Sequence, residues 1–336
     1  MHGAIQQNLS RLKPYLRWAI LGGTLFFIAK TLKDNWQEVL EIAISINSRG
    51  LICLVISFGV TLSAHIWSGW VWSCIFRELE QPVQGGWGIQ VYLITNIAKY
   101  LPGNVWHFYG RIREAQAVGI PFLITSQSVL MESLLMSAAA LLIALFTTPQ
   151  ANLGFRVPIL ALIMIAVHPR VLNPLTQYLA ILKGKVQRKS GADKGIAELK
   201  RYPLLPLLGE LGFVGLRGAG FLITVLALRP FAFTEIPLLL STFSLSWVLG
   251  LVIPGAPGGF GVFEATAITL LDGNFSDGIV LSAVALYRLI SILAEVIGAG
   301  VAWLNKCLSP QISKTPSQDL EEQQDCLLCG NDSGKE

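Results

Sequence analysis

The fold of this chain depends on one stretch in its second half, residues 254–264, which read PGAPGGFGVFE. The stretch lies between two apolar segments, Pro237–Ile253 and Ala265–Leu271. Proline removes a backbone donor and clashes inside a helix, and glycine favours conformations that a helix does not use. The stretch therefore predicts a break between two helices that both read as membrane-buried. Irregular backbone at that depth is tolerated only where it is buried in protein or lines a polar cavity.

A carboxylate, Glu264, ends this stretch. A broken helix with an ionisable group beside the break is typical of binding sites in membrane transporters. The alternative interpretation is an ordinary loop that connects two helices just outside the membrane.

The composition indicates an integral membrane protein. Of 336 residues, 53% are hydrophobic and 14% are charged, whereas soluble domains carry about 25% charged residues. The net charge of +4 is concentrated in loops and at the N-terminus, so it does not predict nucleic-acid binding. Cys326 and Cys329 form a CxxC in the polar tail, but the tail has no second CxxC and no His. We therefore predict no metal site and no cofactor.

Apolar segments predict an all-α polytopic transmembrane bundle of about six to eight spans. Residues 1–17 form a basic N-terminus, residues 18–304 a transmembrane lipid-handling domain, and residues 305–336 a disordered acidic tail. The apolar segments are Trp18–Leu32, Gly50–Phe76, Trp87–Leu101, Phe122–Thr147, Val157–Val167, Tyr202–Leu228, the broken element Pro237–Leu271, and Ile279–Leu304.

Lysine and arginine in the loops predict the orientation, because they are enriched on the cytoplasmic side. The loop Lys183–Arg201 is strongly basic and is expected in the cytoplasm. A full crossing by Trp87–Leu101 would place that loop outside, so we expect this segment to be re-entrant. Pro237–Leu271 is then a second re-entrant element, which enters from the opposite face. We expect a multi-pass protein of the plasma (cell inner) membrane with both termini cytoplasmic.

Charged residues inside the apolar segments form a predicted intramembrane charge network. Each costs about 2.5–3.5 kcal/mol at a helix centre before pairing, so they should face the interior and pair between helices. Structural pairing that holds the helices in register is the alternative to a functional role. The network comprises Lys99, Arg111, Glu132, Glu210, Arg217, Glu264, Arg288 and Glu295.

The broken elements are expected to bring Lys99, Arg111 and Glu264 to the same place. Helix N-termini favour anions, and arginine binds phosphate in a bidentate manner. An anionic headgroup such as a lipid phosphate is therefore the natural ligand for this site.

Two motifs resemble the signatures of the lysylphosphatidylglycerol synthase transmembrane-region family. Residues 99–106 read KYLPGNVW and are followed by Arg111, and residues 254–264 are similar to the second signature. The resemblance covers roughly Tyr15 to Leu304 and implies a helical domain that binds and translocates lipids. The implied headgroup contacts are Lys99, Tyr100, Pro102, Gly103, Asn104, Trp106, Arg111, Pro254, Gly255, Pro257, Gly258, Gly259, Gly261 and Glu264.

The best-understood members of that family carry an attached synthase domain. The residues after Leu304 are too few and too polar to form one, so we do not expect lipid lysylation. The leading hypothesis is a lipid flippase for an anionic or polyprenyl-phosphate lipid, with membrane lipids as its partners.

Two hypotheses from other classes remain open. The first is a membrane enzyme that acts on a polyprenyl-phosphate lipid. It is less favoured, because Asp34, Glu38 and Glu41 form no adjacent or alternating acid pair and no P-loop or nucleophile–base pair is evident. The second is an accessory subunit whose basic loop docks a membrane-bound partner enzyme. A homo-oligomer is also left open.

Overall fold

The computed structural model describes residues 33, 36, 37, 41, 47–101, 105–148, 152–184, 198–253, 259 and 261–308. Throughout this part of the chain the regular elements are helices and none is a strand, which confirms the all-α prediction. Several predicted features lie outside the described residues: the span Trp18–Leu32, most of the basic loop, the tail from residue 309, and the candidate contacts Pro102, Gly103, Asn104, Pro254, Gly255, Pro257 and Gly258.

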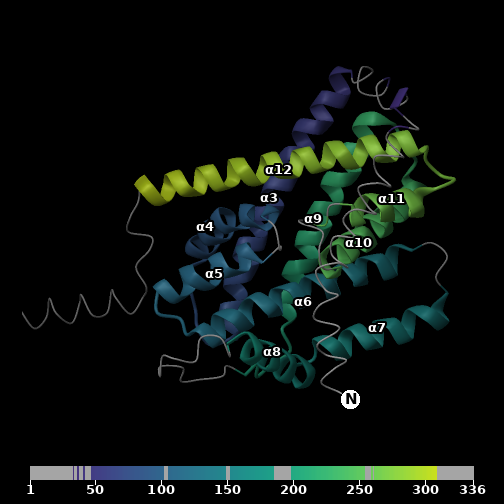
Figure 1. Ribbon diagram of the computed structural model, residues 1–336. Coiled ribbons are helices and arrows are strands. Elements are labelled where there is room, and N and C mark those ends of the chain that lie inside the picture. Colours follow the sequence, from purple (N-terminus) through teal and green to yellow (C-terminus); the bar gives the residue numbers. More distant parts are fainter. Residues whose placement is uncertain are drawn as a thin grey trace, which may run out of the picture.

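The helices follow one another along the chain (Figure 1). Their bounds are α3 Ser48–Glu78, α4 Gly85–Asn96, the 3-10 helix η1 Ile97–Tyr100, α5 Trp106–Ala117, α6 Phe122–Thr147, α7 Leu153–Val167, α8 Pro169–Gly184, α9 Leu204–Leu228, the 3-10 helix η2 Phe233–Glu235, α10 Ile236–Val252, α11 Val262–Leu271 and α12 Asp277–Leu308.

Five helical stretches are long and apolar enough to cross a membrane, namely α3, α6, α9, η2 with α10, and α12. The described residues give a sixth if α7 and α8 form one bent span, since they meet at an angle of 56°. The chain is therefore a multi-pass integral membrane protein. This count reaches the lower end of the predicted six to eight spans.

The side chains are distributed as expected for a bundle in lipid. Apolar residues of α12 such as Leu293 and Val301 point outward, whereas Ser57, Thr61 and His65 of α3 are almost completely buried. Polar groups avoid lipid because an unpaired polar atom in hydrocarbon costs several kcal/mol. The polar and charged side chains consequently gather inside the bundle.

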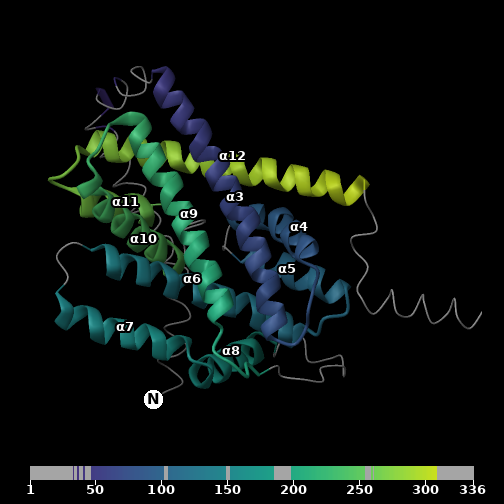
Figure 2. The same cartoon turned by 180° about the vertical axis from the view of Figure 1, so that it is seen from behind.

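Helices α3 and α9 lie side by side in both views and form the centre of the bundle (Figures 1 and 2). Gly220 permits this close approach, because a Cβ atom there would lie 2.7 Å from the Thr61 hydroxyl oxygen. The Ser57 hydroxyl donates to the Gly220 carbonyl over 2.7 Å, and the Trp67 indole donates to the Gly209 carbonyl over 2.8 Å. Small residues and interhelical hydrogen bonds are the usual means of helix association in membranes.

The first broken element is a helical hairpin. Helix α4 ends at Asn96, η1 follows, and α5 packs back against α4. A Cβ atom at Gly110 would lie 3.0 Å from the Thr95 methyl carbon, so the two short helices touch closely. Each has 12 residues and spans about 18 Å, well short of the roughly 30 Å of a bilayer core.

The second broken element has the same form. Helix α10 ends at Val252, and α11 begins at Val262 and packs against α10. The predicted break is thus confirmed. Gly259 has φ +73° and lies against Gly250, where a Cβ atom on Gly259 would be 3.1 Å from the Gly250 Cα atom. Both glycines are needed for this close contact.

Two predicted boundaries were wrong. Helix α11 starts three residues earlier than expected, so Glu264 lies within its first turn instead of beside it. Helix α12 continues to Leu308, so residues 305–308 are helical and do not belong to the tail. Helix α11 includes the apolar residues Val262 and Phe263 at its start, and α12 continues past the end of its apolar pattern.

Candidate functional site

Both broken elements border one cavity of about 130 Å³ in the interior of the bundle. A water molecule needs about 10–15 Å³ on this measure, so the cavity admits several waters or one compact polar group. Its wall includes Lys99 and Tyr100 of η1, Arg111 of α5, and Gly250 and Gly259 at the second break. Helices α3, α4, α6, α9, α11 and α12 complete the wall.

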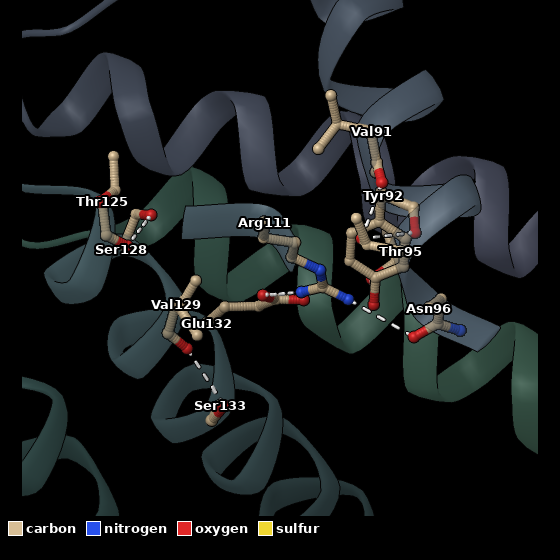
Figure 3. Close-up of polar contacts among 12 residues, drawn as sticks. Val91, Tyr92, Thr95, Asn96, Arg111, Thr125, Ser128, Val129, Glu132 and Ser133 are labelled. Atoms are coloured by element: carbon tan, nitrogen blue, oxygen red, sulfur yellow. Dashed lines mark hydrogen bonds and ion pairs between the residues drawn. The ribbon is translucent and has the colours of Figure 1, made fainter. Parts of the chain in front are cut away.

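Arg111 is held in the wall by residues of two neighbouring helices, α4 and α6 (Figure 3). Its side chain is 2% exposed and pairs with Glu132 of α6 at 2.5 Å. A second guanidinium nitrogen donates to the Asn96 amide oxygen over 3.4 Å, and the guanidinium carbon lies 3.8 Å from the centre of the Tyr92 ring. These contacts fix the position of the arginine and balance its charge.

Lys99 pairs with Glu295 of α12. The ammonium nitrogen lies 2.5 Å from one carboxylate oxygen, and the His65 Nε2 atom lies 3.1 Å from the same oxygen. Glu295 is 1% exposed, so its charge depends on these two partners. The contact ties η1 at the first break to α12.

Glu264 forms a third buried pair, with Arg288 of α12. Its other oxygen accepts a hydrogen bond from the Gly261 amide over 2.7 Å, which caps the start of α11. Arg288 also donates to the Gly259 carbonyl over 2.8 Å. Glu264 and Arg288 together therefore hold the backbone of the second break in place.

Arg217 of α9 differs from the other three cations of the cavity wall. It is 4% exposed, and none of the described residues offers it a carboxylate within salt-bridge distance. Its guanidinium carbon lies 5.0 Å from the ring centres of both Trp247 and Tyr287. One of its terminal nitrogens lies 3.3 Å from His65 Nε2.

Glu210, also on α9, is completely buried, and neither carboxyl oxygen has a hydrogen-bond partner among the described residues. It does not line the cavity. Seven residues separate it from Arg217, which is about 10.5 Å along the helix axis. The two side chains therefore cannot form an ion pair within the helix.

Several buried polar atoms of the cavity wall lack hydrogen-bond partners in the described part of the chain. They are Nδ1 of His65 and His107, Nε of Arg111 and Arg217, Nε1 of Trp247 and the hydroxyl of Ser246. Leaving such a group unsatisfied costs about 1–3 kcal/mol each. Three of these atoms, the Nε atoms of the two arginines and Nε1 of Trp247, can only donate, so the cavity is suited to a group that accepts hydrogen bonds.

The predicted site residues divide into three groups. Lys99, Tyr100, Arg111 and Gly259 line the cavity, whereas Glu264 lies behind it against Arg288. Trp106 is 49% exposed and does not line the cavity. The structure brings Lys99, Arg111 and Glu264 to one region, but each has its own partner and they do not contact one another as a triad.

Sequence reasoning did not assign site roles to Trp247 and Tyr287, which contact Arg217, or to His65 and His107. A single histidine or aromatic residue in an apolar helix carries no signal that separates packing from binding. Across the described segments, no three His, Cys, Asp or Glu side chains come together as a metal site.

Comparison with known protein families finds no family model that matches this chain, and comparison with curated proteins finds no match.

Proposed function

We propose that this protein binds an amphiphile with an anionic headgroup in the interior cavity and carries it across the membrane. The observation that supports this most is the cavity itself, a cationic and donor-rich space enclosed by apolar helices and bordered by two helix breaks. Paired broken helices around a central site are typical of membrane transporters. The resemblance to the lysylphosphatidylglycerol synthase transmembrane-region family points to the same class of substrate, an anionic or polyprenyl-phosphate lipid.

The ion pairs in the wall suggest how a headgroup is accommodated. Lys99 and Arg111 each hold a carboxylate in the cavity wall. An anionic headgroup that enters can share these cations while Glu295 retains its contact with His65. Apolar wall residues such as Phe108 and Ile292 give the first carbons of an acyl chain a suitable surface.

Under this proposal the protein lies in the plasma (cell inner) membrane with both termini in the cytoplasm. The two hairpins then enter from opposite faces. Movement of one hairpin against the other would open the cavity to each leaflet in turn, as the rocking of repeats does in other transporters.

The test is lipid movement in proteoliposomes that contain the purified full chain. Fluorescent phosphatidylglycerol and a labelled polyprenyl phosphate are added, and accessibility to an impermeant quencher is followed in time. Accelerated movement of either lipid over protein-free vesicles is expected. No movement with folded protein would refute autonomous transport and favour an accessory subunit.

A matched pair of variants links movement to the cavity. Ser246 lines the cavity and is fully buried, whereas Ser63 of α3 points outward. Ser246→Leu adds bulk inside the cavity and should abolish movement, while Ser63→Leu should leave it unchanged. Equal activity of the two variants, both folded by size-exclusion chromatography, would contradict transport through this cavity.

A further inference from the structure

The charges around the cavity do not balance. Four cations line it, namely Lys99, Arg111, Arg217 and Arg288. Three carboxylates pair with three of them, Glu295 with Lys99, Glu132 with Arg111 and Glu264 with Arg288. Arg217 is the cation that has no carboxylate within the described part of the chain. One positive charge is therefore left over.

The contact between Arg217 and His65 does not remove this excess. His65 Nε2 is 3.1 Å from a Glu295 oxygen, which accepts hydrogen bonds, and 3.3 Å from an Arg217 nitrogen, which donates them. One ring nitrogen either donates or accepts, so it cannot satisfy both neighbours. If it donates to Glu295, Arg217 has no acceptor in His65.

The aromatic neighbours position Arg217 without using its donors. Trp247 and Tyr287 lie 5.0 Å from the guanidinium carbon, within the range of a cation–π contact. Such contacts engage the face of the guanidinium group, whereas its N–H groups project from the edge. The Tyr287 hydroxyl also donates to the Arg217 carbonyl over 3.0 Å, which anchors that turn of α9. Arg217 lines the cavity, and its Nε–H has no acceptor among the described residues.

Elsewhere among the described residues, no carboxylate lies within salt-bridge distance of Arg217. Glu210 on the same helix is too far along the axis, as shown above. The segments that connect the helices at the two breaks, residues 102–104 and 254–261, contain no acidic residue. A ligand with one negative charge would restore the balance and give the free N–H groups an acceptor.

We propose that Arg217 binds the single anionic group, a phosphodiester, of an amphiphile in the cavity, with Trp247 and Tyr287 as positioning residues. This deepens the proposed function and rests on it. A phosphodiester carries one negative charge, whereas a phosphate monoester carries about 1.5–2 at neutral pH, which exceeds the surplus of one.

The test is equilibrium binding of radiolabelled phosphatidylglycerol to the purified full chain in detergent. Arg217→Gln should weaken binding by about tenfold or more, because a charge-assisted pair is lost. Arg217→Lys keeps the charge but not the planar guanidinium group, so its affinity should lie between those of the unaltered protein and Arg217→Gln. The matched control is Arg229→Gln, which removes the same charge from the half-exposed end of the same helix. It should bind like the unaltered protein.

Four competitors define the ligand. Unlabelled phosphatidylglycerol should compete best, phosphatidic acid with its monoester less well, and diacylglycerol without phosphate not at all. Glycerophosphoglycerol, the free headgroup, should compete only at much higher concentration. Equal competition by the free headgroup would overturn the assignment of an amphiphile. Better competition by phosphatidic acid would overturn the assignment of a singly charged group.

The two levels of the proposal fail in different ways. The role of Arg217 alone is refuted if Arg217→Gln still binds phosphatidylglycerol saturably and with unchanged affinity. This variant must also show a normal elution volume and melting temperature. Absence of saturable binding in the unaltered protein refutes the proposed function as well. If Arg217→Gln fails to fold, Trp247→Leu provides the second variant, and an unchanged affinity there would overturn the positioning role.

Discussion

The buried pair of Arg111 and Glu132 gives the sharpest test of how the charge network is held. Both side chains are 3% exposed or less and lie 2.5 Å apart. Removing one partner leaves the other as an uncompensated buried charge, which costs about 3–5 kcal/mol, whereas replacing both by apolar residues is often neutral. We therefore expect Arg111→Met and Glu132→Met each to lower the free energy of unfolding by that amount. The double variant should be more stable than either single variant.

The assay is unfolding of the detergent-solubilised chain, followed by intrinsic tryptophan fluorescence. The control is Lys306 with Glu114, which lie 2.9 Å apart but are 43% and 39% exposed. Exposed pairs are worth about 0–1 kcal/mol, so Lys306→Met should have a small effect. Two results would contradict a buried, mutually compensating pair: Arg111→Met as mild as Lys306→Met, or a double variant whose loss of unfolding free energy equals the sum of the two single losses.

Three further predictions concern the breaks and the helix contacts. Gly259→Ala places a Cβ atom at φ +73° against Gly250 and should lower the free energy of unfolding by about 1–2 kcal/mol. The control Gly300→Ala has open space around it and should be neutral or slightly stabilising. Equal melting temperatures of the two variants would contradict the close contact. Tyr287→Phe removes the buried hydrogen bond to the Arg217 carbonyl and should cost about 0.5–1.5 kcal/mol in the same unfolding assay. Glu264→Gln removes the charge beside Arg288 and should slow lipid movement in proteoliposomes far more than Glu114→Gln on the exposed surface; similar rates would argue that the second break does not take part.

The sequence was sufficient for the features that follow from local composition. Long apolar runs predicted α6 at its observed bounds and placed α3, α9, α10 and α12 within a few residues of theirs. Proline and glycine predicted the break after α10, because neither residue sustains a helix. The cost of a charge in lipid predicted that the charged side chains face inward and pair between helices, as three of the pairs do.

The sequence could not predict which charged residues pair with one another, because this depends on which helices are in contact. Glu264 was expected near Lys99 and Arg111, yet it pairs with Arg288 and caps α11 through Gly261. The sequence around Arg217 did not distinguish it from the other buried cations. Its distinction arises from what surrounds it, two aromatic rings and no carboxylate among the described residues.

Photochemical labelling would show whether the interior cavity holds an anionic headgroup. A phosphatidylglycerol analogue with a diazirine on its headgroup is irradiated with the full chain in vesicles, and adducts are mapped by mass spectrometry. We expect adducts on Trp247 and Tyr287, and excess phosphatidylglycerol should suppress them. The opposite result would be adducts only on outward-facing residues of α12, such as Leu289 and Leu293, with the cavity residues unlabelled. That result would contradict headgroup binding in the cavity.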